Sequence, residues 1–133
     1  NNDTYSEIIF KHIDKLRDND NFKILPSLRF EYYLILLKNS EFIIGNSSSG
    51  IREAPVYGVK AINLGNRQQN RTTSNLVKNI NFDEKNILNE LRKTKKIKNK
   101  KVFNFGKGNS AKLFIKNLNS NKFWKTDRQK YFS

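Results

Sequence analysis

The stretch best suited to chemistry runs from residue 42 to residue 71, where an apolar segment ends in glycine and small hydroxyl residues before a helical segment begins. Free backbone N–H groups and the positive end of the helix dipole meet at such a junction, and small residues let a phosphate approach the backbone. Ser47 and Ser48 could donate hydroxyl and amide hydrogen bonds to a diphosphate. The alternative interpretation is an ordinary serine cap of the helix.

Four small or polar residues around these serines are expected to shape the loop: Gly45, Asn46, Ser49 and Gly50. Gly50 in particular lacks the side chain that would block the approach of a ligand to the backbone. Pro55 is compatible with a first helical turn, so we expect the helix to begin at Ser49 or Gly50.

Three charged residues follow the serine loop. A carboxylate close to bound phosphates would be repelled, so a ligand-contacting Glu53 should instead face a neutral diol such as the ribose of a nucleotide. Arg67 and Arg71 lie in a loop beyond the next apolar segment, where guanidinium groups could neutralise a diphosphate. The alternatives are a carboxylate placed favourably against the helix dipole and two exposed arginines on a basic protein.

The elements that must position these residues are read from hydrophobic spacing. Strands are predicted at residues 22–25, 42–44, 60–64 and 76–80. Helices are predicted at residues 5–18, 30–37, in a short segment ending near Gly58, at 83–93 with Asp83 near its start, and behind Ser110. The apolar faces expected to be buried are Ile9, Ile13 and Leu16 in the first helix and Ile87, Leu88 and Leu91 in the fourth.

Strands alternating with helices at this spacing predict an α/β protein with a doubly wound parallel sheet covered on both faces. The carboxyl ends of parallel strands are where such sheets bind ligands, which is where the serine loop would lie. The chain opens directly into a helix although a doubly wound unit normally leads with a strand, so we expect the sequence to begin partway through its domain.

Composition narrows the class further. The length of 133 residues and 36% hydrophobic content fit one domain, and no apolar run is long enough for a membrane span. The start has no signal-peptide pattern, there is no cysteine and only one histidine, so we expect a cytoplasmic protein without a metal site. His12 lies beside the apolar face of the first helix and is expected to be a partly buried structural residue.

The net charge of +14 would attract polyanions, which keeps a basic nucleic-acid-binding module open as an alternative function. Many of the lysines fall in one run at residues 92–101, and a solvated charged surface explains that run more simply. We therefore do not expect nucleic acid to be the partner.

Two motifs, taken in order, resemble those of hydrolysing UDP-N-acetylglucosamine 2-epimerases, the sugar-nucleotide enzymes of sialic-acid-type biosynthesis. The first is GNSSSGIRE at residues 45–53, followed by INLGNRQ at residues 62–68 and by Arg71. The second is FGKGNSA at residues 105–111, similar to a later glycine-rich turn of the family. The opening residues 1–3 look like the tail of the family's Pro-Asn-x-Asp segment, so the resemblance spans nearly the whole chain.

The resemblance implies a GT-B architecture of two Rossmann-like domains with the active site between them, residues 1–133 supplying part of the C-terminal, UDP-binding domain. Carried over by position, the residues and their expected roles are Ser47, Ser48 and Arg67 on the diphosphate, Glu53 on the ribose hydroxyls, Leu28 on uracil through its backbone, and Asn1 at a substrate-contact position. The family's reaction eliminates UDP to a glycal and then adds water, without a redox cofactor.

The catalytic carboxylates of the family lie in its N-terminal domain, and its active-site histidine lies upstream of the Pro-Asn-x-Asp segment. Neither region is present and His12 does not align with that histidine, so the resemblance implies a half-site that needs the N-terminal domain. A homodimer is a further expectation from the family. A different GT-B enzyme, such as a glycosyltransferase, is the second alternative, and Arg67-Gln68 after Asn63-Leu64-Gly65 favours the epimerase.

Overall fold

The computed structural model describes residues 6–93 and 100–126, and the chain divides into two compact units, Asn1–Ile35 and Leu36–Ser133. The first unit holds α1 (Ser6–Asp14) and the start of α2 (Phe30–Asn39). The strand predicted at residues 22–25 is wrong, because this segment is irregular and the Phe22 N–H donates to the Asn19 carbonyl in a turn, at 2.9 Å. A short apolar run forms a strand only when it finds a partner strand.

The predicted apolar face of α1 is also more open than expected. Ile9 is 62% exposed, Ile13 and Leu16 are half-buried, and no residue of α1 is buried. His12 is exposed, so the expectation of a partly buried histidine is wrong. Helical spacing identifies the helix correctly, but it cannot say whether another surface covers the apolar side.

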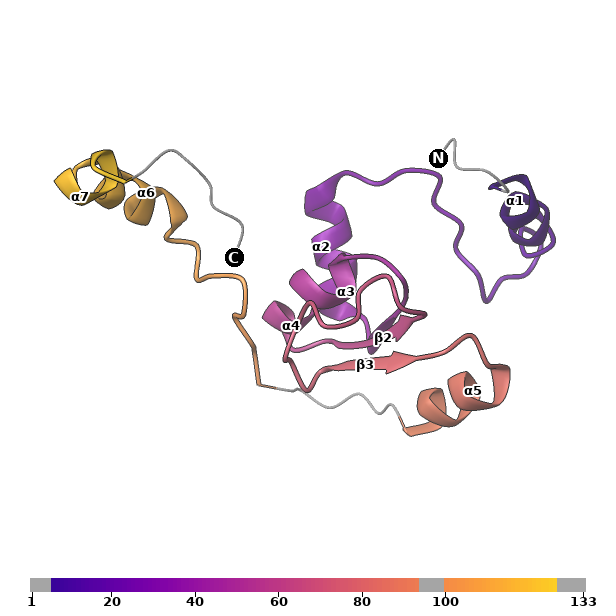
Figure 1. The fold of residues 1–133 in the computed structure, drawn as a ribbon. Coiled ribbons are helices and arrows are strands. Elements are labelled where there is room, and N and C mark those ends of the chain that lie inside the picture. The colour runs from indigo at the N-terminus through magenta and orange to yellow at the C-terminus, as the bar shows by residue number, and fades with distance from the viewer. Residues whose placement is uncertain (1–5, 94–99, 127–133) are drawn as a thin grey trace. The chain divides into compact units, whose positions relative to one another are not determined.

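The second unit contains the sheet, formed by β1 (Phe42–Gly45), β2 (Lys60–Leu64) and β3 (Val77–Ile80) in that order (Figure 1). All pairings are parallel, and the register aligns Gly45 with Asn63 and Asn63 with Asn79. This confirms the predicted α/β class with a parallel sheet flanked by helices. Among the described residues β1 is an edge strand, and its Ile44 is exposed.

The helix between β1 and β2 is split in two. The first half is α3 (Ser49–Arg52) and the second is α4 (Ala54–Tyr57), with Glu53 between them. Pro55 lies in the first turn of α4, and Gly58, at φ 73°, ends α4 in the left-handed conformation that glycine adopts without strain. The predicted helix start at Ser49 and end near Gly58 are therefore both confirmed.

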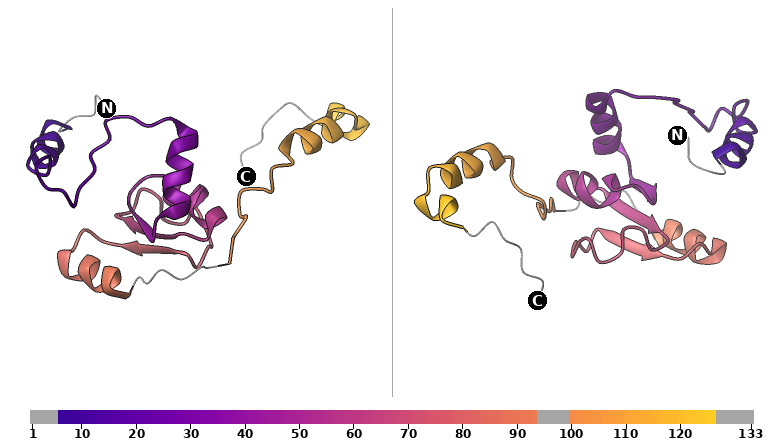
Figure 2. Two further views of the ribbon diagram at one scale, coloured as in Figure 1. Left: turned by 180° about the vertical axis from the view of Figure 1, so that it is seen from behind. Right: turned by 45° about the horizontal axis from the view of Figure 1, so that its top comes forward.

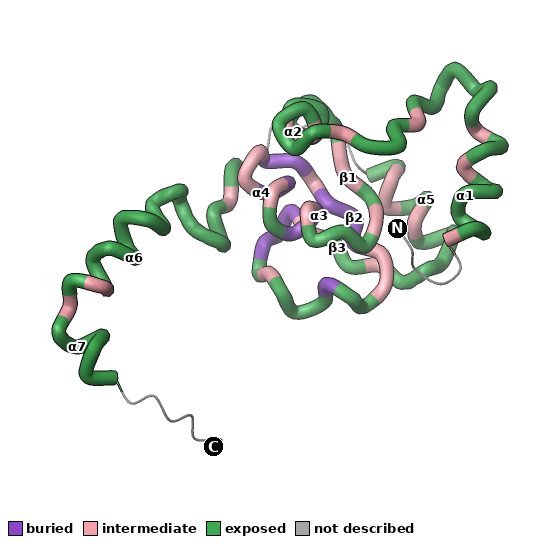
Figure 3. The backbone as a smooth tube through the Cα atoms, turned by 90° about the horizontal axis from the view of Figure 1, so that it is seen from above, coloured by how far each residue is buried: buried purple, intermediate pink, exposed green. Residues whose placement is uncertain are grey.

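The core lies where α3 packs on β1 and β2 and where α4 packs on β2, as the right-hand view of Figure 2 shows. Its buried apolar residues, which include those drawn in purple around β2 and α4 in Figure 3, are Leu37, Ile51, Ala54, Val59, Ala61, Ile62 and Leu76. The core is thus small and centred on the segments that lead into and out of the serine loop.

The connection from β2 to β3, residues 65–76, is a loop without a helix, as predicted for residues 66–74. Parallel strands usually need a helical crossover, so this loop must cover part of the sheet itself. It does so by burying Gln68, Ser74 and Leu76, and by two backbone reversals with positive φ at Gly65 and Asn70.

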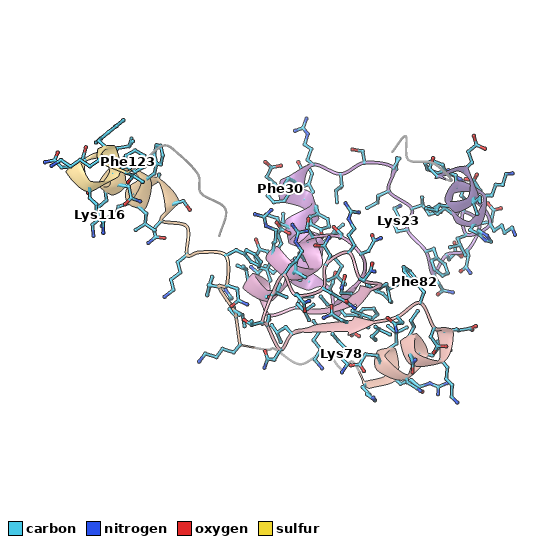
Figure 4. The ribbon with its side chains drawn as sticks, in the orientation of Figure 1. Lys23, Phe30, Lys78, Phe82, Lys116 and Phe123 are labelled. Carbon is cyan, nitrogen blue, oxygen red and sulfur yellow. The ribbon has the colours of Figure 1, made fainter. Side chains whose placement is uncertain are left out.

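The remaining helices are α5 (Glu84–Lys93), α6 (Ser110–Leu118) and α7 (Asn121–Trp124). The predicted start of α5 is confirmed, since the Asn86 N–H donates to the Asp83 carboxylate at 2.7 Å. Its predicted buried side is only partly correct, because Ile87 and Leu91 are half-buried whereas Leu88 is 43% exposed. Figure 4 shows Lys116 on α6 and Phe123 on α7, and no residue of either helix is buried.

Two other findings concern the described residues only. None of the helices at residues 6–93 and 100–126 has the length and apolar character that crossing a membrane requires. Within the same ranges, no group of three or more His, Cys, Asp or Glu side chains is placed to hold a metal ion.

Candidate functional site

The loop after β1 presents two backbone N–H groups that make no hydrogen bond within the described part of the chain. The Gly50 N–H donates to the Ser47 carbonyl at 3.2 Å and the Arg52 N–H to the Ser48 carbonyl at 3.0 Å, which winds the chain into α3. The N–H groups of Ser47 and Ser48 themselves have no acceptor among the described residues. Both serines are exposed, so these donors are open to a ligand or to water.

The two serine hydroxyls differ in their relation to the start of α3. Ser48 occupies the cap position of α3, but its side chain makes no capping hydrogen bond. The Ser47 hydroxyl accepts from the Ser49 N–H at 3.3 Å, a local turn that leaves the hydroxyl proton free to be donated outward. The capping interpretation therefore accounts for Ser47 but not for the Ser48 hydroxyl, and both hydroxyl protons can still be donated to an anion.

The two glycines of the loop have different roles. Gly45 has φ 145°, a backbone conformation that other residues rarely adopt, with open space where a side chain would be. Gly50 is buried, and a Cβ atom on it would lie 3.4 Å from the Ala61 Cβ and 3.9 Å from Cγ2 of Ile43. The expectation that Gly50 clears a path for the ligand is thus wrong, because this glycine lets α3 approach the sheet.

Glu53 lies at the junction of α3 and α4, one turn beyond the serine loop. Its N–H donates to the Ser49 carbonyl at 3.1 Å, and the residue is half-buried. The carboxylate has no hydrogen-bond or ion-pair partner in the described part of the chain. It is therefore a free acceptor close in sequence to the serine donors.

The loop after β2 is joined to the serine loop by Gln68, to which the sequence analysis assigned no role. This side chain is 2% exposed, its Nε2 donates to the Asn46 carbonyl at 3.1 Å, and its Oε1 accepts from Arg71 Nη1 at 2.9 Å. Parallel strand ends meet at one sheet edge, so a contact between these loops was foreseeable. A buried glutamine between two arginines was not, because polar loop residues are usually exposed.

Asn63, on β2, is the second polar residue that the sequence analysis left without a role. It is 2% exposed, and its Nδ2 donates to the Asn79 Oδ1 at 2.8 Å across β2 and β3. Its own Oδ1 has no partner among the described residues, and Asn63 lines a cavity of about 10 Å³ together with Gly45 and Ser47. That volume is close to the minimum of roughly 10–15 Å³ that one water needs.

A pocket of about 220 Å³ lies between the loop after β2 and the segment that contains Asn104 and Phe105. Three contacts hold that segment: the Val102 N–H donates to the Pro55 carbonyl at 2.9 Å, Asn104 Nδ2 donates to Thr72 Oγ1 at 3.1 Å, and the Arg52 guanidinium carbon lies 5.6 Å from the centre of the Phe105 ring. The residues that line the pocket are Asn70, Arg71, Thr72, Thr73, Asn104 and Phe105.

The structure thus brings part of the predicted site together. The serine loop and Arg71 are connected through Gln68, and Arg71 hydrogen-bonds to a neutral amide, so its charge has no carboxylate partner among the described residues. Arg67 is exposed in the same loop without a recorded contact to the serines. Leu28 is half-buried in the other unit, and Asn1 lies outside the described residues.

The three parallel strands with helices packed on them define an α/β domain with an open sheet. The comparison with known families is more specific. The profile of the UDP-N-acetylglucosamine 2-epimerase family matches residues 1–119, and the chain belongs to that family.

Individual relatives agree with the family. The chain is 39% identical over 136 residues to a UDP-N-acetylglucosamine 2-epimerase of Neisseria meningitidis serogroup B, an alignment that covers 99% of this chain and 36% of that protein. It is 44% identical over 71 residues to the polysialic acid biosynthesis protein P7 of Escherichia coli, covering 53% of this chain and 18% of that protein.

A third relative, of Legionella pneumophila, is named a UDP-N,N'-diacetylbacillosamine 2-epimerase (hydrolyzing) and is 34% identical over 92 residues, covering 69% of this chain and 24% of that protein. The chain therefore spans little more than a third, or less, of the length of these relatives. Those shares fit the expectation of the C-terminal half of a two-domain architecture.

Proposed function

We propose that this chain is the UDP-binding part of a hydrolysing UDP-N-acetylglucosamine 2-epimerase, which converts UDP-N-acetylglucosamine and water to N-acetylmannosamine and UDP. The observation that carries the proposal is the pair of N–H groups at Ser47 and Ser48 that have no acceptor among the described residues, in a loop that Gln68 connects to Arg71. Two amide dipoles and a guanidinium that lacks a carboxylate partner form a binding set for a diphosphate.

The roles of the remaining residues follow from charge. Glu53 has a free carboxylate one turn away, and repulsion from phosphate favours a contact to the ribose hydroxyls instead. Arg67, exposed in the loop after β2, supplies a second positive charge for the diphosphate. Leu28 and Asn1 keep the roles that the family resemblance gave them, on uracil and on the substrate.

The chemistry that this part serves is departure of UDP. In the proposed reaction the C1–O bond to UDP breaks as a proton leaves C2, giving a glycal, and water then adds across the double bond with C2 inverted. Stabilising the negative charge of the departing diphosphate lowers the barrier to bond breaking. The proton transfers need acid and base groups, which we assign to the N-terminal domain, so the chain alone is proposed to bind but not to turn over substrate.

The proposed substrate belongs to the class of N-acetylated UDP-sugars. The Legionella relative and a further relative, of Campylobacter jejuni, are named for diacetylbacillosamine donors, whereas the Neisseria relative is named for UDP-N-acetylglucosamine. We take UDP-N-acetylglucosamine as the substrate, with a diacetylated bacillosamine donor as the alternative, because the sugar contacts are assigned to the other domain. The family match favours this function over that of another GT-B glycosyltransferase.

The test is a calorimetric titration of the chain with UDP and with pyrophosphate. Glu53→Ala should weaken UDP at least about tenfold, as expected for loss of hydrogen bonds from a charged group, and should change pyrophosphate affinity little. Glu84→Ala, which removes an exposed carboxylate from α5, is the matched control and should change neither. Equal weakening of both ligands, or no UDP binding by the unaltered chain, would contradict the proposal.

The basic charge calls for one more comparison. If nucleic acid were the partner, binding of a single-stranded oligonucleotide would be tight and would fall steeply as salt rises. The proposed function predicts instead that UDP binds at the serine loop. An oligonucleotide should then not displace bound UDP at 150 mM salt, about the physiological ionic strength.

A further inference from the structure

Gln68 is buried in an unusual position for a glutamine, with both ends of its amide in use. Its Nε2 reaches back 22 residues to the Asn46 carbonyl, and its Oε1 holds Arg71 Nη1. The side chain is 2% exposed, whereas its neighbour Gln69 is exposed. An interior position raises the strength of both hydrogen bonds and the cost of losing either one.

The two partners of Gln68 belong to two separate elements of the proposed diphosphate site. Asn46 precedes the two serines whose N–H groups have no acceptor among the described residues, and Arg71 is a cation that hydrogen-bonds to the neutral Gln68 amide. Without the amide, the serine loop would lose the hydrogen bond that joins it to the loop after β2, and Arg71 would lose its contact with the Gln68 amide. A long arginine side chain released from such a contact regains rotamer freedom, which must be lost again on binding.

We propose that Gln68 is a positioning residue that sets the distance between the serine loop and Arg71, so that both meet the same diphosphate. The inference rests on the proposed function for the ligand, and it goes beyond it by making the affinity for diphosphate depend on a residue that need not touch the ligand. It acts by pre-organisation, because a site already held in its binding geometry loses less free energy when the ligand arrives.

The alternative is a purely structural glutamine that stabilises the loop after β2. The two roles predict different effects of substitution on stability and on UDP affinity. If the role is structural, substitution of Gln68 lowers the stability of the fold and leaves the UDP affinity of the folded protein unchanged. If it is a positioning role, the substitution weakens UDP binding well below the melting temperature, and this effect depends on Arg71. The test therefore needs affinity, coupling to Arg71 and local dynamics, each measured on protein that circular dichroism shows to be folded.

The variants are Gln68→Met, Arg71→Met, the double variant, and Gln69→Met as the control for a nearby exposed glutamine. Methionine keeps the length of the side chain and removes both hydrogen bonds. We expect Gln68→Met and Arg71→Met each to weaken UDP about tenfold, and Gln69→Met to stay within about twofold. On the Arg71→Met background the further effect of Gln68→Met should fall below about threefold, because the two residues act as one unit.

Hydrogen exchange of the free protein tests the other contact. The amides of Gly50 and Ile51 donate to the Ser47 and Ser48 carbonyls. These amides should exchange faster in Gln68→Met than in the unaltered protein, and their exchange rates should not change in Gln69→Met. Full additivity of the two substitutions, or unchanged UDP affinity in Gln68→Met, would overturn the proposal. If Gln68→Met does not fold, Arg71→Met decides, since unchanged UDP affinity in that exposed variant also overturns it.

A failure of the proposed function gives a different pattern. The unaltered chain would then bind no UDP at all, and the exchange measurement alone would judge the role of Gln68. Faster exchange at Gly50 and Ile51 in Gln68→Met would support the connection between the loops, and unchanged exchange would refute it.

Discussion

Gly50 and Ala61 face each other where α3 lies against β2, and a Cβ atom on Gly50 would lie 3.4 Å from the Ala61 Cβ. Gly50→Val should lower the free energy of unfolding by roughly 1–3 kcal/mol, because its extra methyl groups have no room. Gly50→Ala should change it less, since its better helix propensity, worth about 1 kcal/mol, offsets a tight contact. Urea denaturation of both variants gives the comparison, and equal effects would show that space between α3 and β2 is not limiting.

Gly65 begins the loop after β2 with φ 74°, and a Cβ atom on it would lie 2.8 Å from Cε2 of Phe82, the residue labelled just beyond β3 in Figure 4. Phe82 is 74% exposed, so its ring can move aside and the backbone conformation should dominate the cost. Gly65→Ala should therefore destabilise the protein by about 1–2 kcal/mol.

Thermal or urea denaturation of Gly65→Ala, and of the double variant that also carries Phe82→Ala, separates the backbone cost from the cost of the contact with the ring. If the backbone dominates, removing the ring should recover little of the lost stability. Recovery of most of it would assign the cost to the contact with Phe82 instead.

The sequence alone was sufficient for the elements that build the site and insufficient for the contacts that join them. The apolar runs at residues 42–44 and 60–64, Pro55 and Gly58 identify β1, β2 and the helices between them, because these signals are local. Gln68 could not be recognised as buried, since its burial depends on two loops meeting that are joined by a bond across 22 residues of sequence. Asn63 is buried because its strand lies in the middle of the sheet, where its amide pairs with Asn79 of β3. Exposure of His12 and Leu88 was missed for the same reason, as spacing shows a face but not what covers it.

Asp83 begins α5 by accepting the Asn86 N–H at 2.7 Å. Asp83→Ala should lower stability by about 1 kcal/mol, because one N–H of the first turn loses its acceptor, while Asp83→Asn should cost only a few tenths. Amide exchange at Asn86 checks the local effect, and Glu84→Ala, one residue later and without a recorded cap bond, is the control. Equal loss in Asp83→Ala and Asp83→Asn would mean that charge rather than capping stabilises the start of α5.

Asn63 buries an amide whose Oδ1 has no partner among the described residues, and the residue lines a small cavity together with Gly45 and Ser47. An unsatisfied buried acceptor costs about 1–3 kcal/mol, more than the roughly 1 kcal/mol that the bond to Asn79 returns. Leucine has the branching of asparagine without polar atoms, and Asn79 is exposed enough to be hydrated, so Asn63→Leu should raise the free energy of unfolding by about 1 kcal/mol. Urea denaturation measures this directly, with Asn79→Leu as the partner control, which leaves the Asn63 amide entirely unpaired and should destabilise. A loss of stability in Asn63→Leu would show instead that a water in the cavity satisfies Oδ1 and holds the floor of the serine loop.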